Sequence, residues 1–191
     1  MRYSAEHAEA TRARVLEACE RAFREHGFGG IGVEGLSRAA KVTTGAFYNH
    51  FPSKAAAFAA VVTAGVARAG AGLDFGRRTF GADWLTAAAG YYLSAGHRRD
   101  VAGGCALPSL SGEVARADPQ TRIAYETELA KVAAMVAEGL PGGPDRRAAW
   151  PVLAQLVGGV LLARAVQDQG LAQEIADAVM AAVPAGAAQH A

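Results

Sequence analysis

Residues 33–54 read VEGLSRAAKVTTGAFYNHFPSK and contain two short amphipathic segments with a break between them. Apolar residues recur at helical spacing in Val33–Ala40, and Thr43 is a suitable N-cap for a second segment, Thr44–His50. A proline and Ser53 then end that segment and begin a longer helix. Two short helices joined by a tight turn, the second opening on small polar residues, predict a helix-turn-helix.

The second helix of this motif offers polar and small side chains to DNA if Phe47 and Phe51 pack inward. Threonine and asparagine can hydrogen-bond phosphates or base edges, and glycine permits close backbone approach. A lysine beside a helix N-terminus favours phosphate. The candidate DNA-binding residues are Lys41, Thr43, Thr44, Gly45, Tyr48, Asn49, His50 and Lys54. For His50, packing beneath the helix is an equal alternative.

The segment from Gly27 to Lys54 resembles the tetracycline-repressor (TetR) family, above all in residues 42–54, VTTGAFYNHFPSK. The most specific part is the Tyr48-x-His50-Phe51 core followed by Ser53-Lys54. The resemblance implies a recognition helix at about Thr44–His50, with Tyr48, His50 and Lys54 as phosphate contacts. It also implies a homodimer whose two recognition helices enter successive major grooves of a partly palindromic operator.

Two positions depart from the usual pattern of that family. Gly32 replaces the Thr or Ser that caps the first short helix, and Lys41 stands where the turn often has glycine. If the turn is left-handed at Lys41, a non-glycine residue costs about 1–2 kcal/mol. A cation beside DNA offsets part of that cost in the complex.

Composition favours an all-α protein of about nine helices. The 191 residues are 51% apolar with a formal net charge of +1, alanine dominates the apolar share, and strictly alternating β-branched runs are scarce. Residues 1–68 carry nine Lys/Arg against six Asp/Glu, a net of +3, whereas residues 69–191 carry ten against twelve. A basic front suits contact with a polyanion.

The chain divides into four predicted parts. They are a helix-turn-helix DNA-binding domain at 1–52, a connecting helix at 53–69, a helical effector-binding and dimerisation domain at 70–184, and a frayed tail at 185–191. We interpret the clustered Gly70, Gly72, Gly76 and Gly81 as a flexible connection. Further helices are expected from Asp83, around Cys105–Val114, and over about 119–139, 145–167 and 171–183.

Cys105 follows two glycines at a predicted helix start, with Arg98 and Arg99 near in sequence. The helix dipole there lowers the thiol pKa and favours a reactive thiolate, as in some TetR-like regulators that have a similar Gly-Cys pair. The alternative is that Cys105 only packs, as we expect of Cys19. An apolar effector pocket, or else ordinary core, is indicated by Trp84, Tyr91, Tyr92, Cys105, Tyr125, Met135 and Trp150.

The last two long helices present an apolar stripe, which by the family resemblance is a four-helix dimer interface. The stripe consists of Leu153, Leu156, Val157, Val160, Leu161, Ile175 and Val179. Gly158 and Gly159 allow close helix approach. The alternative is that these residues only close the core of the monomer.

These observations predict a bacterial cytoplasmic one-component regulator: a repressor that binds operator DNA and responds to a small-molecule effector. No cofactor or metal is expected, because no paired carboxylates with a histidine, phosphate-binding loop or metal-spaced cluster is apparent. No disulfide, signal peptide or run of about 20 lipid-compatible residues is apparent either, so no membrane partner is expected. An enzyme is the first rival interpretation. A helical scaffold that binds protein and not DNA is the second.

Overall fold

The computed structural model describes residues 2–184, with side chains from residue 7 onward. Over that range the chain forms ten α-helices and one short 3-10 helix, η1, and no strand. The prediction of an all-α protein is confirmed. The predicted frayed tail, 185–191, lies outside the described residues.

The helices follow one another with short connections. In chain order they are α1 (Arg2–Gly30), α2 (Val33–Ala39), α3 (Thr44–His50), α4 (Lys54–Phe80), η1 (Gly81–Asp83), α5 (Trp84–Tyr92), α6 (Ala95–Arg99), α7 (Ala106–Val114), α8 (Pro119–Glu138), α9 (Arg146–Ala165) and α10 (Gln169–Ala182). The short α6 had no counterpart among the predicted helices. Gly27 has a φ of 73°, so the helical conformation of α1 is interrupted at this residue.

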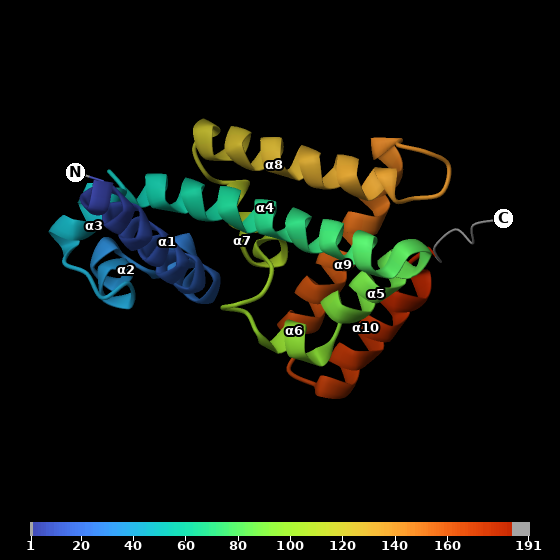
Figure 1. Ribbon diagram of the computed structural model, residues 1–191. Coiled ribbons are helices and arrows are strands. Elements are labelled where there is room, and N and C mark those ends of the chain that lie inside the picture. Colours follow the sequence, from blue (N-terminus) through green and yellow to red (C-terminus); the bar gives the residue numbers. More distant parts are fainter. Residues whose placement is uncertain (1, 185–191) are drawn as a thin grey trace.

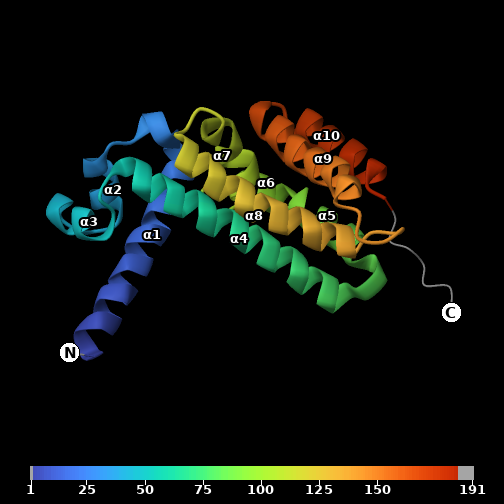
Figure 2. The ribbon, with the colours of Figure 1, turned by 90° about the horizontal axis from the view of Figure 1, so that it is seen from above.

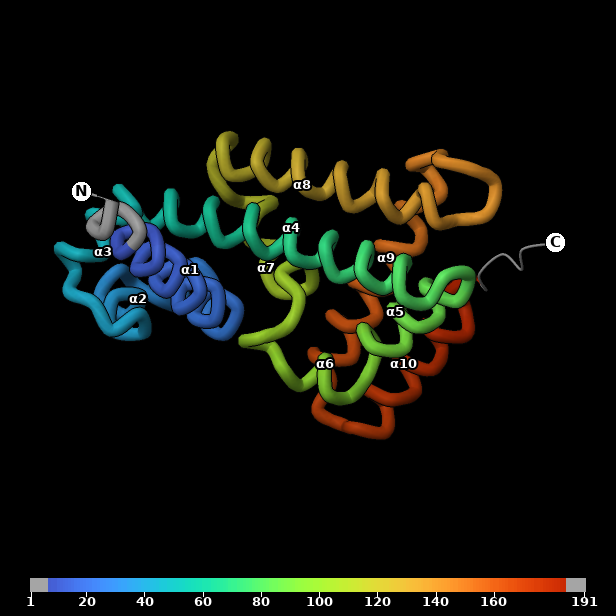
Figure 3. Tube along the Cα trace, in the orientation of Figure 1, coloured from blue at the N-terminus to red at the C-terminus, as the bar shows by residue number. Residues whose placement is uncertain are grey.

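Helices α1 to α3 group at one end of the molecule, and α4 leads from this head along the rest of the protein (Figure 1). Seen from above, α8 lies beside α4 over much of its length (Figure 2). Helices α5, α6, α9 and α10 gather around the far half of α4, as the tube in Figure 3 shows. The helix-turn-helix therefore lies at one end of the long helix α4, and the rest of α4 packs in the other part of the protein.

The predicted flexible connection at the glycine cluster is wrong, because α4 continues unbroken to Phe80. A β-carbon at Gly70 would stand 3.2 Å from Val132 Cγ2 of α8, so glycine there permits close helix packing. Burial against α8 outweighs the cost of about 1 kcal/mol that each helical glycine carries. Of the four glycines only Gly81, with a φ of 53°, lies at the end of the helix.

Two apolar cores meet along α7. One lies in the head and includes Val15, Phe23, Phe47 and Phe58, together with Leu110 of α7. The other fills the space among α4, α5, α8, α9 and α10, and Leu107 belongs to it. Because neighbouring turns of α7 pack in different cores, a displacement of α7 would alter the packing of both cores.

Side-chain caps begin most of the longer helices as the sequence predicts. Thr43 accepts from Ala46 N at 3.1 Å, Ser53 from Ala56 N at 3.0 Å, and Asp118 from Thr121 N at 2.9 Å. Asp83 is an exception, because it precedes α5 without a capping hydrogen bond. Pro151 lies inside α9, which begins five residues earlier at Arg146.

Two helical stretches are long and apolar enough to cross a membrane by composition alone, contrary to the expectation from sequence. Lys54–Tyr92 and Arg146–Ala165 have 18-residue windows of mean hydropathy 1.5 and 1.4. The first contains the break at Gly81, and both stretches place side chains such as Val61 and Val160 in the protein's own cores. Packing within the protein accounts for this apolar character.

Candidate nucleic-acid interface

Helix α3 has one buried face and one free face. Phe47 and Phe51 are buried in the core of the head, as predicted. Tyr48 is 48% exposed, and Thr44 and Asn49 are exposed beside it. Packing of the aromatic side chains thus turns hydroxyl and amide groups outward from a short helix, which is the arrangement that a reading helix needs.

The N-terminal end of α3 leaves room for a close approach of DNA. A β-carbon at Gly45 would meet only the Thr43 hydroxyl, at 4.0 Å. In the preceding turn, exposed Lys41 has a φ of 56°, the left-handed conformation in which glycine is usual. The departure noted at Lys41 therefore carries a strain of about 1–2 kcal/mol.

Two of the candidate phosphate contacts are partly engaged within the protein. Lys54 Nζ lies 4.3 Å from the centroid of the Phe28 ring, a cation–π contact. His50 is half-buried, and its backbone carbonyl accepts a hydrogen bond from Arg12. DNA contact by Lys54 and His50 stays a prediction, as it does for the exposed residues of α3.

Arg12 is a residue of this site that the sequence did not indicate. Its guanidinium lies 4.6 Å above the Phe51 ring while it donates to the His50 carbonyl, so α1 holds the last turn of α3. The two partners are 38 residues apart. Helical periodicity relates residues three and four apart, so no local signal reports such a contact.

Residues 15–61 match the family model described as bacterial regulatory proteins, tetR family. The matched segment covers most of α1, all of α2 and α3, and the start of α4, which together build the head. The head of this chain is therefore a TetR-family helix-turn-helix domain. In this TetR-family helix-turn-helix, α2 and α3 are the paired helices, and α3 presents the free face.

Solved structures agree over the whole length with this assignment of fold. The reduced form of Escherichia coli NemR has a TM-score of 0.74 at 22% identity, covering 92% of this chain and 99% of that one. TetR-family regulators from Chloroflexus aurantiacus and Agrobacterium tumefaciens give TM-scores of 0.72 and 0.71 at 20% and 19% identity. They cover 92% and 93% of this chain, and 95% and 100% of their own. Curated protein sequences show no match.

The seven candidate effector residues do not form one group. Trp84 is buried and its Nε1 donates to the Gly139 carbonyl at 3.0 Å, as a core tryptophan does. Tyr91 is 71% exposed, and Trp150 is exposed on α9. Met135 lies against Gly70, between α8 and α4. These four are separate from the remaining three.

Tyr92, Cys105 and Tyr125 come together beneath α7, and their charges and hydrogen bonds influence one another. Tyr125 Oη lies 2.7 Å from Ser111 Oγ, whereas the buried Tyr92 hydroxyl has no oxygen or nitrogen partner among the described residues and lies beside the Cys105 thiol. Burial raises the pKa of both tyrosines, so both hydroxyls are neutral donors at pH 7. This group is the best candidate for the polar part of an effector site.

Cys105 begins α7 as predicted, but burial opposes the expected activation of its thiol. Its Sγ accepts from Leu107 N at 3.4 Å, and its backbone N–H donates to His97 Nε2 at 3.4 Å. Burial raises the thiol pKa by more than the helix start, Arg24 and Arg164 lower it. Arg98, expected near the thiol, instead donates to the Ala172 carbonyl of α10.

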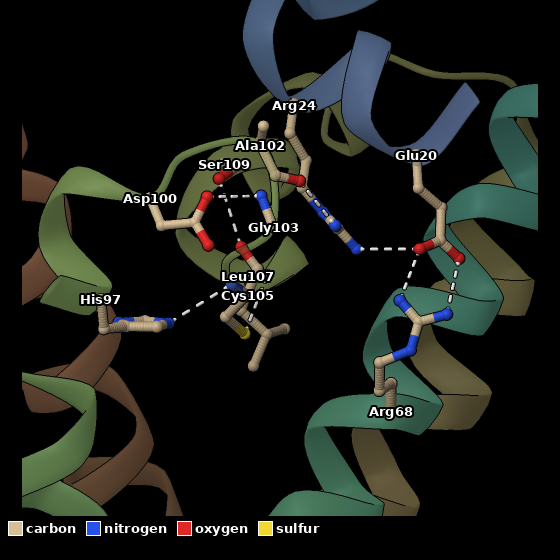
Figure 4. Close-up of polar contacts among 10 residues, drawn as sticks. All are labelled: Glu20, Arg24, Arg68, His97, Asp100, Ala102, Gly103, Cys105, Leu107 and Ser109. Atoms are coloured by element: carbon tan, nitrogen blue, oxygen red, sulfur yellow. Dashed lines mark hydrogen bonds and ion pairs between the residues drawn. The ribbon is translucent and has the colours of Figure 1, made fainter. Parts of the chain in front are cut away.

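A buried polar cluster joins the head to both α4 and the loop before α7 (Figure 4). Glu20 of α1 accepts from Arg68 of α4, at 3.0 Å for the Nη2–Oε1 pair, and from Arg24 at 3.3 Å. Arg24 also donates to the Ala102 carbonyl at 2.9 Å. Because Glu20 and Arg24 are buried and paired, whereas Arg68 closes the cluster from the surface, a relative movement of α1 against the loop breaks charge-assisted hydrogen bonds.

A second tie runs from α7 itself to the end of α1. The Glu113 side chain accepts from the Phe28 backbone N–H. Gly27 makes room for that carboxylate, since a β-carbon there would stand 2.6 Å from Glu113 Oε1. The helix that carries Cys105 at its start therefore holds the base of the head at its other end.

The predicted dimer stripe is divided between the inside and the outside of the protein. Leu153, Leu156 and Val160 are buried in the core of the monomer, so their assignment to an interface is wrong for this fold. Val157, Ile175 and Val179 are half-buried, and Leu161 is 52% exposed. A β-carbon at Gly159 would lie 3.0 Å from Val179 Cγ2, so that glycine serves α9–α10 packing within one chain.

A different stripe faces outward on α9 and α10. It consists of exposed small and apolar residues at helical spacing: Ala154, Leu161, Leu162 and Ala165 on α9, half-buried Gly158 among them, and Leu171 and Ala178 on α10. A β-carbon at Gly158 would meet no atom within 4 Å. This outer stripe is the part of the two helices available to a second chain.

Proposed function

We propose that this TetR-family chain binds a partly palindromic operator as a homodimer, represses transcription in the cytoplasm, and is released by a small-molecule effector. The observation that carries the proposal is the free face of α3, where Thr44, Tyr48 and Asn49 are exposed opposite the buried Phe47. Hydroxyl and amide groups on a helix of this size suit base edges and phosphates in the major groove.

The homodimer is supported by the outer stripe of α9 and α10. Contiguous exposed apolar side chains on a soluble protein mark interaction surfaces. A two-fold pairing of this stripe sets the two copies of α3 at a defined spacing, which an operator of matching symmetry satisfies. Repression follows from occupancy of a promoter alone and needs no contact with polymerase.

The proposed effector acts at Tyr92, Cys105 and Tyr125. A ligand that supplies an oxygen acceptor to the buried Tyr92 hydroxyl, which has only the weakly hydrogen-bonding Cys105 thiol beside it, gains a stronger hydrogen bond than the free protein offers. The ties from Arg24 and Glu113 then transmit a displacement of α7 to the head. A useful switch requires the effector to bind the two states with free energies that differ by a few kcal/mol.

The alternative to a reversibly bound effector is one that reacts covalently with the Cys105 thiol. It requires attack by a Cys105 thiol whose pKa burial raises, so we favour reversible binding beside Cys105 over modification of it.

A helical scaffold that binds protein instead of DNA is the rival function. Salt separates the two, because phosphate contacts release counterions and make affinity fall steeply with ionic strength. An apolar protein interface responds little to the same change.

The test is fluorescence anisotropy of the full chain on labelled DNA from upstream of its own gene, at two salt concentrations. Tyr48→Ala is compared with Tyr91→Ala, which removes an exposed tyrosine remote from α3. We expect specific binding, weakened about tenfold or more by Tyr48→Ala and unchanged by Tyr91→Ala. Absence of salt-sensitive binding, there and on a random-sequence selection library, supports the scaffold instead.

A further inference from the structure

A surface cavity of about 220 Å³ lies where α6 meets α9 and α10, and three arginines line it. They are Arg98 and Arg99 at the end of α6 and Arg164 near the end of α9. We propose that this cavity is a binding site for a small oxyanion, a phosphate or carboxylate group. The proposal is independent of the operator and of the effector group, since none of Tyr92, Cys105 and Tyr125 lines the cavity.

Arg98 is a buried cation without a carboxylate. It is 7% exposed, and its Nη atoms donate to the Ala172 carbonyl at 3.1 Å and to Gln173 Oε1 at 2.7 Å. Both acceptors are neutral. Within residues 7–184 no carboxylate oxygen lies within the 4 Å of a salt bridge to it, whereas buried charges in proteins are normally paired.

Arg164 repeats this pattern. Its guanidinium donates to the carbonyls of Arg98 at 2.9 Å and His97 at 3.0 Å, and to Ser109 Oγ at 3.1 Å. All of these acceptors are neutral too. Burial is the main cause that lowers the pKa of Arg164, and the charge of Asp100, which makes no ion pair with it, only partly opposes that effect.

The two nearest acids have other partners and do not line the cavity. Asp100 turns its carboxylate to the backbone N–H of Gly103 at 2.8 Å, as Figure 4 shows. Asp168 caps α10 and accepts from Leu171 N at 2.6 Å. The lining therefore holds three formal positive charges and no formal negative charge.

Arg99 and the start of α10 supply the donors. Arg99 is exposed at the rim, and its side chain makes no hydrogen bond or ion pair with the described residues, so its guanidinium is available for bidentate contact. Gln169, the first residue of the 14-residue α10, also lines the cavity, and first-turn amides have no partner within a helix. Arg98 and Arg164 contribute mainly charge.

The size of the cavity limits the ligand. Pockets for drug-sized molecules measure about 300–1,000 Å³, so 220 Å³ fits inorganic phosphate, a short carboxylic acid or one anionic group of a larger metabolite.

The experiment is an NMR titration of the full-length ¹⁵N-labelled protein with inorganic phosphate, against chloride at equal pH and ionic strength. We expect saturable shifts of the amides of Val101 and Gln169, which border the cavity. Arg99→Gln should weaken phosphate binding about tenfold or more, the loss expected for one charge-assisted contact. Arg122→Gln, an exposed arginine on α8 with no side-chain partner among the described residues, makes the same charge change and should leave binding unaltered.

Because Arg99 is exposed, its substitution leaves the fold intact, which the unperturbed remainder of the spectrum verifies. Shifts confined to α3 and the start of α4 would assign the phosphate to the helix-turn-helix and overturn the proposal. Unsaturable shifts, or equal effects of Arg99→Gln and Arg122→Gln, would overturn it as well.

Discussion

Cys105 illustrates how two physical effects compete at a single residue. The start of α7 and two arginines favour the thiolate, whereas burial favours the neutral thiol, and burial is the larger effect. The position of the residue along its helix is visible in the sequence. Its burial is not, because it depends on the packing of α1, α4, α8 and α9 against α7.

We predict that Cys105 of the folded protein reacts with iodoacetamide only at high pH. Its pKa is raised, so the reactive thiolate forms above the ordinary range, and the alkylation rate should still be rising at pH 9. Peptide mapping separates Cys105 from Cys19, whose pKa burial raises to about 11. The urea-unfolded chain, titrating near the usual value of about 8.5, is the control. A rate that levels off below pH 8 would restore the thiolate sensor.

Residues whose roles depend on neighbours in sequence were predicted well. Thr43 caps α3, Phe47 is buried, and Tyr48 is exposed, because helical periodicity determines each of these from local spacing. Arg12 and the contact of Arg24 with the Ala102 carbonyl were not recognised, since these partners lie 38 and 78 residues away. The pairing of such residues is a property of the folded chain.

At the scale of helices, α4 shows why a composition rule failed. Four glycines in twelve residues resemble a linker, yet three of them lie inside the helix. Glycine has two opposite uses, since it loosens a free chain and also lets two helices approach closely. Only the positions of α7 and α8 show that these glycines serve close helix packing. The start of α4 was therefore predictable from the sequence, whereas its end was not.

Two glycine-to-alanine substitutions in α4 distinguish a glycine that permits close helix packing from one that does not. Gly65→Ala places a β-carbon 2.6 Å from Ala106 Cβ of α7, whereas Gly72→Ala meets no atom within 4 Å. Both gain helix propensity, about 1 kcal/mol, but overpacking at Gly65 costs about 1–3 kcal/mol. In urea denaturation we expect Gly72→Ala to raise the free energy of unfolding by about 0.5–1 kcal/mol and Gly65→Ala to lower it. Stabilisation of both variants to the same extent would contradict the close approach of α4 and α7.

In the whole molecule, α7 connects two cores that the sequence places at opposite ends of the chain. Leu110 packs in the core of the head, and Leu107 packs in the core among α4, α5, α8, α9 and α10. The hydrogen bond from Arg24 to the Ala102 carbonyl lies just before α7, and the one from the Phe28 N–H to Glu113 lies near the end of α7. The order of helices and the helix-turn-helix were predictable from motifs. The division of the dimer stripe was not, because α9 is apolar on both its inner and its outer face and periodicity alone does not rank them.

The outer stripe of α9 yields a prediction about assembly. Leu161→Glu places a carboxylate at an exposed position, so the monomer should fold normally, but in a two-fold interface each dimer would bury two such charges. Sedimentation velocity should show the dimer dissociation constant raised about 100-fold or more, near 2.7 kcal/mol, with operator affinity falling in parallel.

Ile123→Glu on α8, where isoleucine is 61% exposed, introduces the same charge outside the stripe and should alter neither the dimer dissociation constant nor the operator affinity. A Leu161→Glu protein that stays dimeric at concentrations where the unmodified chain is dimeric would move the interface away from α9. If dimerisation is lost while operator affinity is retained, a single head suffices for binding, and the predicted two-fold operator is wrong.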